Sequence, residues 1–266
     1  MTITAPPPTP GRLLAAAEDG PFVPAPRFQG FGGLHGGLAL ALATAAMQRH
    51  APQARLRSAS ARLHRAVTGT FQLATRTMRV GRITTCAGEL ADEEGPLVDA
   101  SAIFSVPRAG NWPRFAPPAP AAPPPADCEV FRIPPEFVPI SEFWEIRPVG
   151  PNRPYARCAE PELTAWVRLT EDDTPPDAHR LVLLMDALAP AYAAVLSDLL
   201  LVPTMELTVH PAEGLETASS PWVLLRARTR GAGAAGWNEE IIDAWDPQGV
   251  HLGTAHQLRL GRGDAA

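Results

Sequence analysis

One carboxylate stands inside an apolar segment of the sequence. Asp186 interrupts residues 181–191 (LVLLMDALAPA), which are otherwise apolar. Burying a carboxylate is costly unless it is hydrogen-bonded, and a buried carboxylate is more basic than an exposed one, as a general base requires. Asp186 is therefore a candidate base. The alternative is structural, because a lone aspartate in a helix commonly reaches solvent or caps a neighbouring loop.

Two further polar residues, Thr204 and Gln257, are candidates for holding such a carboxylate and a water molecule. A glutamine amide both donates and accepts hydrogen bonds, so it can orient a water without competing for its proton. Both residues also fit plain structural roles. Threonine is favoured in strands, and Gln257 could be the solvent-facing position of an alternating strand.

The segment His35-Gly36-Gly37 opens an apolar stretch that is predicted to be helical. Backbone N–H groups at a helix start are unpaired and lie at the positive end of the helix dipole. Glycine lets another molecule approach this backbone closely, so Gly36 and Gly37 are candidate donors to a developing negative charge. His35 is expected to stack or hydrogen-bond at the helix start rather than act as a base. The glycines could instead serve only close helix packing.

The elements that position these residues repeat one plan on either side of a proline-rich stretch. Residues 112–125 (WPRFAPPAPAAPPP) can neither continue a helix nor occupy a central strand, so they are predicted to be an extended linker. A buried apolar helix is expected at 36–49 and another at about 178–196, with a kink at Pro190. Consecutive strands beside a single helix predict an α+β fold. The strand-like runs are 54–67, 71–80, 84–90 and 97–106, then 144–147, 163–169, 204–210, 222–230, 239–245 and 253–260.

The proline-rich stretch also sets the expected domain organisation. Each half is close to the common size of one domain. We expect an N-terminal tail over 1–20, an N-terminal repeat over 21–110, a linker over 111–135 and a C-terminal repeat over 136–266.

Composition argues against several functions. The chain has 266 residues and a net charge of −5, which is unlike a nucleic-acid binder. No apolar run is long enough to cross a bilayer, and residues 1–20 lack the features of a signal peptide, so a cytoplasmic location is expected. The chain contains no lysine, which excludes a Schiff-base lysine and a Walker-A phosphate loop. Its three cysteines fit neither a disulfide framework nor a zinc site, so no metal is expected.

Two other motifs carry no function. Residues 231–236 (GAGAAG) spell the dinucleotide fingerprint, but residues 237–245 after them are predicted to form a strand where the fingerprint needs a helix. The segment is therefore interpreted as a hairpin loop. His210 and His256 stand near candidate site residues in the sequence, but no partner at metal-ligand spacing accompanies them.

Four short segments resemble those of known thioesterases. Residues 31–37 (FGGLHGG) resemble the helix start of hotdog-fold thioesterases. Residues 185–191 (MDALAPA), 203–210 (PTMELTVH) and 252–257 (LGTAHQ) resemble the segments that carry the catalytic aspartate, threonine and glutamine of acyl-CoA thioesterase II-type enzymes. The resemblance covers nearly the whole chain apart from the tail and the linker. It implies a double hotdog, with two antiparallel sheets each wrapped around a long buried helix.

The same resemblance implies an activity. It implies hydrolysis of acyl-CoA to a free acid and CoA by a water activated by Asp186, Thr204 and Gln257, without an acyl-enzyme. Gly36 and Gly37, together with His35, would form the oxyanion and substrate-binding part of the site. The substrate would be acyl-CoA or an acyl carrier protein, with no metal or redox cofactor, no nucleic acid, no membrane, and association into a homo-oligomer. The absence of a G-x-S-x-G motif removes the serine-hydrolase route to this reaction.

The sequence also departs from the resemblance. Family members usually continue the threonine strand with an aromatic-rich stretch, where this chain has residues 208–211 (TVHP), and follow the glutamine with an acidic residue and a glycine, where this chain has Leu258 and Arg259. These departures bear on acyl-chain preference. When the two predicted helices are compared, Thr44 stands where Asp186 does, so one catalytic site is expected rather than two.

Two other functions remain open from the sequence. A hotdog dehydratase or hydratase needs a catalytic histidine with a partner acid near a helix start, and His35 has only a distant acid. A non-catalytic acyl-CoA-binding module would keep the fold and leave Asp186 without a chemical role.

Overall fold

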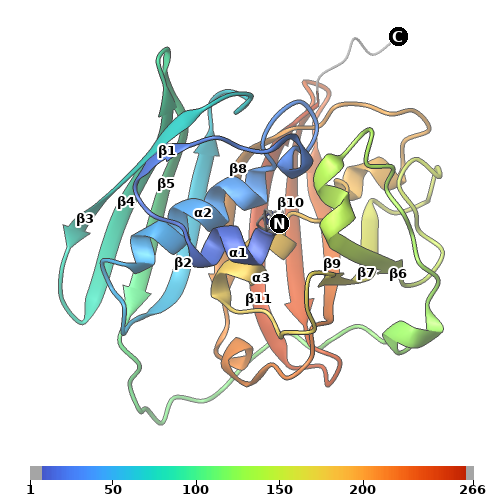
Figure 1. Cartoon of the computed structure of the whole chain (residues 1–266). Coiled ribbons are helices and arrows are strands. Elements are labelled where there is room, and N and C mark those ends of the chain that lie inside the picture. Colours follow the sequence, from blue (N-terminus) through green and yellow to red (C-terminus); the bar gives the residue numbers. More distant parts are fainter. Residues whose placement is uncertain (1–7, 262–266) are drawn as a thin grey trace, which may run out of the picture.

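Eleven strands form one antiparallel sheet in the computed structural model, which describes residues 8–261. Along the sheet the strands follow the order β1-β3-β4-β5-β2-β8-β11-β10-β9-β7-β6 (Figure 1). The strands of the first half are β1 (Gly20–Phe22), β2 (Arg55–Leu63), β3 (Phe71–Arg79), β4 (Ile83–Asp92) and β5 (Gly95–Ser105). Those of the second half are β6 (Trp144–Pro148), β7 (Glu162–Leu169), β8 (Thr204–Pro211), β9 (Val223–Ala232), β10 (Trp237–Trp245) and β11 (His251–Leu260).

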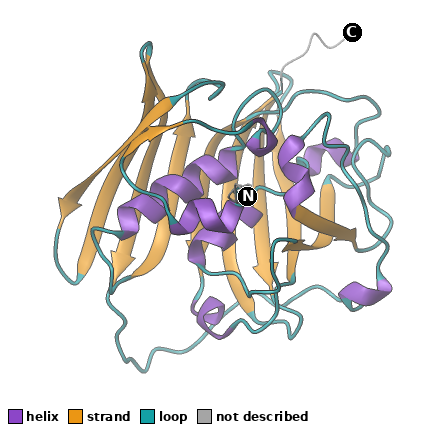
Figure 2. Ribbon diagram, in the orientation of Figure 1, coloured by secondary structure: helices purple, strands orange, loops and turns teal. Residues whose placement is uncertain are grey.

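The two halves meet where β2 pairs with β8. Ala59 lies opposite Val209 and Arg62 opposite Glu206 in this ladder, and the hydroxyls of Ser60 and Thr208 are 2.8 Å apart. We expected two antiparallel sheets, one in each repeat, and the structure joins them edge to edge into one continuous sheet. The pairing satisfies backbone N–H and C=O groups that two free edges would leave open. The α+β architecture itself is confirmed, with the α-helices gathered on one face of the curved sheet (Figure 2).

The first half wraps around helix α2 (Gly36–Gln48). Every residue from Gly37 to Met47 is buried, as the all-round apolar sequence predicts. His35 is the N-cap, and its side chain accepts a hydrogen bond from the Leu38 N–H. The helix therefore begins with its N-terminus fixed inside the protein.

The second helix is much shorter than the sequence predicts. Helix α3 (Ala178–Leu184) ends two residues before Asp186, so the expected helix over about 178–196 is wrong. Pro190 has no N–H to donate and disfavours helical backbone at the residue before it, so the helix cannot continue unbroken to residue 196. The chain turns irregularly through residues 185–190 and resumes as the 3-10 helix η4 (Ala191–Ala194). Asp186 thus lies on a turn, where its side chain is not tied to a helix face.

The part of the chain before the first repeat also packs on the helices. Residues 1–7 of the expected tail lie outside the described residues. Helix α1 (Pro10–Ala15) contacts α2 and α3 and buries Leu14, and its Gly11 N–H donates to Glu171 Oε1 at 2.8 Å. The remaining short 3-10 helices are η1 (Pro26–Phe28), η2 (Pro125–Asp127), η3 (Pro139–Phe143) and η5 (Glu213–Thr217).

The proline-rich segment packs against two tryptophans of the second half. The indole N–H of Trp245 donates to Pro117 O at 2.9 Å, and that of Trp166 donates to Pro123 O at 2.8 Å. Glu240 of β10 accepts a hydrogen bond from the Ala191 N–H of η4, so it lies on the sheet face that bears the helices. Side chains alternate along β10, so Trp245 points to the opposite face. The segment therefore covers the side of the sheet that is turned away from the helices. Among residues 8–261, no helix is long and apolar enough to span a membrane.

Candidate active site

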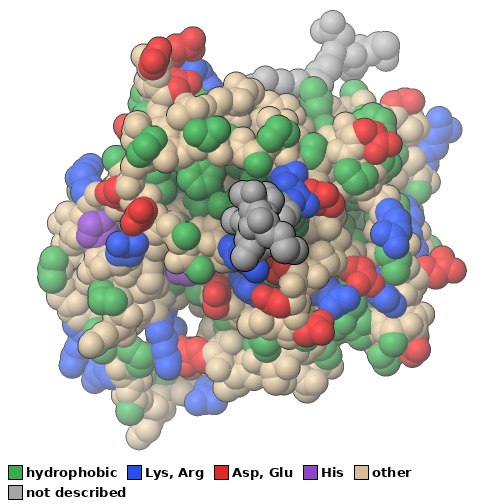
Figure 3. All heavy atoms as spheres, viewed as in Figure 1, with side chains coloured by type: hydrophobic (Ala, Val, Ile, Leu, Met, Phe, Trp, Pro, Cys, Tyr) green, Lys and Arg blue, Asp and Glu red, His purple; other side chains and the backbone are tan. Residues whose placement is uncertain are grey.

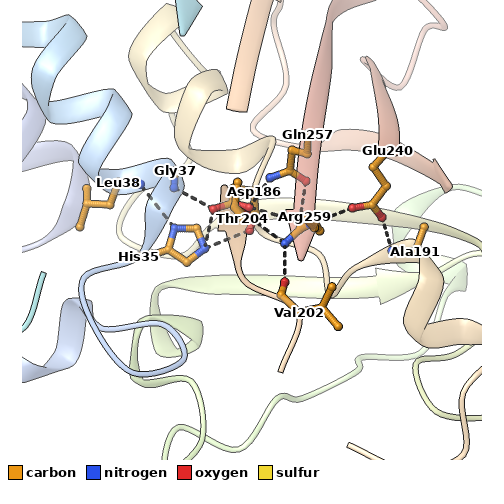
Figure 4. Close-up of polar contacts among 10 residues, drawn as sticks. All are labelled: His35, Gly37, Leu38, Asp186, Ala191, Val202, Thr204, Glu240, Gln257 and Arg259. Atoms are coloured by element: carbon orange, nitrogen blue, oxygen red, sulfur yellow. Dashed lines mark hydrogen bonds and ion pairs between the residues drawn. The ribbon is translucent and has the colours of Figure 1, made fainter. Parts of the chain in front are cut away.

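The carboxylate of Asp186 lies where the two halves of the chain meet. Its Oδ2 accepts a hydrogen bond from the Gly37 N–H at 2.7 Å, and its Oδ1 accepts one from Gln257 Nε2 at 2.6 Å (Figure 4). Gly37 belongs to the first turn of α2 and Gln257 to β11, so both repeats hold one carboxylate. Asp186 is buried, and these bonds offset the cost of removing its charge from water.

His35 fixes the same junction through both ring nitrogens. Nε2 lies 2.9 Å from the backbone oxygen of Asp186, and Nδ1 lies 3.4 Å from the Leu38 nitrogen. Hydrogen bonding assigns the proton to Nε2, because Nδ1 must accept from an N–H. Burial lowers the pKa of His35 below its usual value, chiefly because the charged form loses its hydration. The ring is therefore a neutral donor that holds the turn carrying Asp186.

Thr204 reaches the carboxylate only through an arginine. Its Oγ1 accepts from Arg259 Nη1 at 2.9 Å, and Arg259 Nη2 lies 3.4 Å from Asp186 Oδ1. Arg259 Nη2 also donates to the amide oxygen of Gln257 (Figure 4). The structure therefore brings Asp186 and Gln257 into direct contact and places Thr204 one residue further away.

The helix start offers one free backbone donor. The Gly37 N–H is occupied by Asp186, and the Leu38 N–H by His35. The Gly36 N–H has no hydrogen-bond partner within residues 8–261, and Gly36 lines the adjacent cavity. Of the two glycines considered as oxyanion donors, Gly36 is thus the one that lines the cavity and keeps its N–H free within the described residues.

Two buried charged residues, Glu240 and Arg259, were assigned no role in the site from the sequence. Glu240 is fully buried; its Oε2 accepts from Arg259 Nε at 2.6 Å, and its Oε1 accepts from the Ala191 N–H. A signal was present, because Arg259 follows Gln257 by two positions on one strand and so shares its face. Glu240 lies directly opposite Gln257 in the β10–β11 ladder. The strand alternation predicts this neighbourhood once the register is known.

A cavity of about 520 Å³ opens beside these residues. Its polar end is formed by His35, Gly36, Asp186, Thr204 and Arg259. Most of its remaining wall is apolar, and Phe31, Phe137 and Leu199 on its lining are exposed to solvent. Gln257 is 1% exposed and lies behind Asp186, outside the cavity lining of the described chain. Gln257 can therefore hold the carboxylate but does not face the cavity.

Thr44, the residue of the first repeat that was compared with Asp186, carries no carboxylate. Thr44 Oγ1 lies 3.0 Å from the carbonyl oxygens of Leu40 and Ala41 and 3.3 Å from His179 Nδ1. A hydroxyl that bonds to its own helix is a structural group. The geometry thus agrees with one site per chain.

The remaining candidates lie outside this site. His210 and His256 are exposed on β8 and β11 with ring centroids 6.4 Å apart, and no cluster of residues suited to a metal occurs within residues 8–261. Residues 231–232 end β9, and residues 233–236 form the turn of the β9–β10 hairpin, so the strand predicted after the glycine-rich segment is confirmed. Acidic and basic side chains are intermixed on the helix-bearing face (Figure 3), so this face has no broad basic surface of the kind that binds nucleic acid.

We expect Gly37→Ala to lower turnover. A Cβ at this position would lie 2.7 Å from Asp186 Cβ and 3.0 Å from Leu183 O, so the helix start must move away from the carboxylate. A displacement below 1 Å at a reacting group lowers kcat by about 10-fold to 100-fold. Gly69→Ala is the matched control, because nothing lies within 4 Å of the added carbon. Equal steady-state rates for the two variants would contradict the role of this contact.

We also expect the protein to become less stable as the pH is lowered through the range in which histidine side chains titrate. Burial lowers the pKa of His35 and of His179, so below about pH 6.5, the usual pKa of histidine, the unfolded chain binds protons that the folded chain does not. The free energy of unfolding should therefore decrease from about pH 7.5 to about pH 5.5, and His35→Asn should make this decrease shallower. His210→Asn, at an exposed position, should leave it unchanged. Chemical denaturation across this pH range measures the slope, and a slope equal in all three proteins would contradict the assignment.

The sequence matches two family models that together span the fold. Residues 24–105 match an acyl-CoA thioesterase N-terminal domain, and residues 107–260 match an acyl-CoA thioesterase C-terminal domain. No curated protein matches the sequence significantly.

Solved structures share the architecture at low identity. A protein of unknown function with a hot dog fold from Alicyclobacillus acidocaldarius superposes with a TM-score of 0.85 at 20% identity, over 95% of this chain and 98% of that one. A protein assigned as a thioesterase II from Thermobifida fusca gives 0.79 at 22%, over 95% and 98%. An acyl-CoA thioesterase II from Mycobacterium marinum gives 0.69 at 19%, over 86% and 90%. These similarities confirm the predicted hotdog fold.

Proposed function

The chain belongs to the acyl-CoA thioesterase family and is a thioester hydrolase, and from this premise we propose that it hydrolyses acyl-CoA to a free acid and CoA at the Asp186 site. One observation carries the proposal. A buried carboxylate stands at the polar end of a largely apolar cavity, held in place by both repeats. An aliphatic acyl chain fits the apolar wall, and its thioester would then lie beside Asp186.

The proposed reaction is direct attack by water. Asp186 Oδ2 accepts one protein hydrogen bond and keeps a lone pair for a water molecule, whose proton it takes as the water oxygen bonds to the thioester carbon. The Gly36 N–H and the positive end of α2 stabilise the negative charge that forms on the carbonyl oxygen. Collapse of this intermediate breaks the carbon–sulfur bond, and the thiolate of CoA leaves and takes the proton from Asp186. No acyl-enzyme forms.

Thr204 and Gln257 have different parts in this proposal. Because Arg259 donates to Thr204 Oγ1, the hydroxyl hydrogen of Thr204 is free to point into the cavity toward the water or the carbonyl. Gln257 lies behind Asp186 and orients its carboxylate. Of the three residues, two therefore face the substrate and one acts through its neighbour.

The geometry argues against a dehydratase or hydratase. Such a lyase needs a histidine with a free nitrogen to move a proton. The expectation that His35 has only a distant acid is wrong, because Asp186 Oδ2 lies 3.6 Å from His35 Nε2. Both nitrogens of His35 are nevertheless committed, one to the Asp186 carbonyl and one to the Leu38 N–H. A non-catalytic binding module is the second candidate, favoured by the largely apolar wall of the cavity.

Thiol release from a panel of acyl-CoAs of increasing length, with one acyl carrier protein, tests the proposal. Hydrolysis of one or more CoA esters supports it. Tight binding of acyl-CoA without thiol release would favour the binding module, and hydrolysis restricted to the carrier protein would change the assigned substrate.

A further inference from the structure

We propose that Arg259 is a positioning residue of this site, whose guanidinium, anchored by Glu240, fixes the Gln257 amide and turns the Thr204 hydroxyl toward the cavity. The inference rests on the proposed hydrolytic function. It concerns two residues, one on each strand of the β10–β11 hairpin, that the resemblance to known thioesterases does not assign.

Every donor of the Arg259 side chain has an acceptor. Nε donates to Glu240 Oε2 at 2.6 Å, Nη1 faces Thr204 Oγ1 at 2.9 Å and Val202 O at 3.5 Å, and Nη2 faces Gln257 Oε1 and Asp186 Oδ1, the latter at 3.4 Å. A guanidinium carries five N–H donors in one rigid plane. Its orientation is therefore fixed by the five acceptors together, and each acceptor is fixed in return.

The first consequence is the orientation of the Gln257 amide. Its oxygen accepts from Arg259, so its NH₂ group must face Asp186 and donate to the carboxylate. Without the guanidinium the amide oxygen loses this donor, and the bond to the carboxylate alone orients the amide. Arg259 thus fixes the amide from its other side, in the orientation that holds the base.

The second consequence concerns Thr204. A hydroxyl that accepts from a cation keeps its own hydrogen free. Thr204 lines the cavity, so this hydrogen is available to the attacking water or to the thioester oxygen. Arg259 therefore makes Thr204 a donor toward the substrate.

Glu240 supplies the anchor and the charge balance. It is fully buried, and its second oxygen accepts from the Ala191 N–H, which directly follows the turn that carries Asp186. Two buried carboxylates, Glu240 and Asp186, thus surround one buried cation. The cation balances one carboxylate and leaves the other with its charge, as a base requires.

A purely structural ion pair is the competing explanation, and a double variant separates the two. Removing one partner of a buried pair destabilises a protein, whereas removing both can restore stability. Glu240→Gln keeps an acceptor for the Ala191 N–H, and Arg259→Met keeps an unbranched side chain of similar length. We expect the double variant Glu240→Gln/Arg259→Met to recover most of the Tm lost in the single variants while kcat stays about 100-fold below wild type, with little change in KM.

Two further variants complete the experiment. Arg259→Lys preserves the charge beside Glu240 and should fold, but one ammonium cannot reach Gln257 and Thr204 together, so kcat should again fall about 100-fold. The pair Arg226→Met/Glu162→Gln removes a bidentate ion pair outside the cavity lining and should retain wild-type kcat. All rates are measured below the lowest Tm of the set.

The outcomes separate this inference from the proposed function. Wild-type kcat in the double variant or in Arg259→Lys overturns the positioning role, even when Asp186→Asn is inactive. A wild-type protein that hydrolyses no thioester overturns the proposed function and the inference together. Low kcat in both Arg259 variants, with the control pair active, supports the inference.

Discussion

Replacing Asp186 with asparagine is expected to reduce kcat by about 10²-fold to 10⁴-fold, the usual contribution of a general base. The amide oxygen of asparagine can still accept from the Gly37 N–H, so the fold should persist. It cannot take a proton from water, so the nucleophile is lost. Thiol release at saturating acyl-CoA, measured on folded protein, gives the ratio of rates.

A second buried aspartate provides the control. Asp246 is 4% exposed, and its Oδ1 accepts from the Gln248 and Val250 N–H groups in a turn outside the cavity lining. Asp246→Asn can keep both bonds and should retain kcat. If Asp186→Asn were as active as Asp246→Asn, the base would have to be another group, and His35→Asn would be the next variant to assay.

The site shows why neither repeat suffices alone. The first repeat contributes the start of α2, with a backbone donor for Asp186 and a free N–H at Gly36. The second contributes the carboxylate, the hydroxyl and the amide from the turn after α3, from β8 and from β11. The β2–β8 ladder fixes the two repeats relative to each other. The edge pairing therefore also sets the distance between the base and the oxyanion donor.

Local sequence predicted much of the fold. The all-round apolar run after His35 specifies a buried helix, and the structure gives α2 over Gly36–Gln48. Alternating runs specify strands such as β8 and β11. The end of α3 was missed because the apolar run continues past Leu184, whereas Pro190 and the hydrogen bond from the Ala191 N–H to Glu240 favour a turn. Apolar periodicity carries no information on that distant acceptor.

The pairing of elements could not be predicted from one sequence. A period-two pattern states which residues share a face, but many partners satisfy the same pattern. The contact between Gly37 and Asp186 spans 149 positions, and that between Arg259 and Glu240 depends on the β10–β11 register. The resemblance drew attention to Asp186, Thr204 and Gln257. It gave no reason to consider Glu240. In the local sequence Glu240 is simply one of two adjacent acidic residues in a strand.

That adjacency allows a direct test of the buried charge. Glu240→Ala is expected to destabilise the protein by about 3–5 kcal/mol, because it leaves the Arg259 cation buried beside the Ala191 N–H without their shared acceptor. In a protein of this size such a loss lowers Tm by roughly 10 °C. Calorimetry or denaturant titration measures it.

The neighbouring Glu239 provides the control for Glu240→Ala, because it is the same residue type on the same strand but is not buried. It is exposed on the same strand, so Glu239→Ala should change stability by about 0.5 kcal/mol at most. Nearly equal stability of the two alanine variants would mean that water or a rearranged Asp186 neutralises Arg259, and the fixed guanidinium geometry would then be wrong. A large loss of stability in Glu240→Ala alone means that the buried Glu240 carboxylate stabilises the Arg259 cation, which lines the cavity. Arg259 would then be held in the orientation that its contacts to Gln257 and Thr204 require.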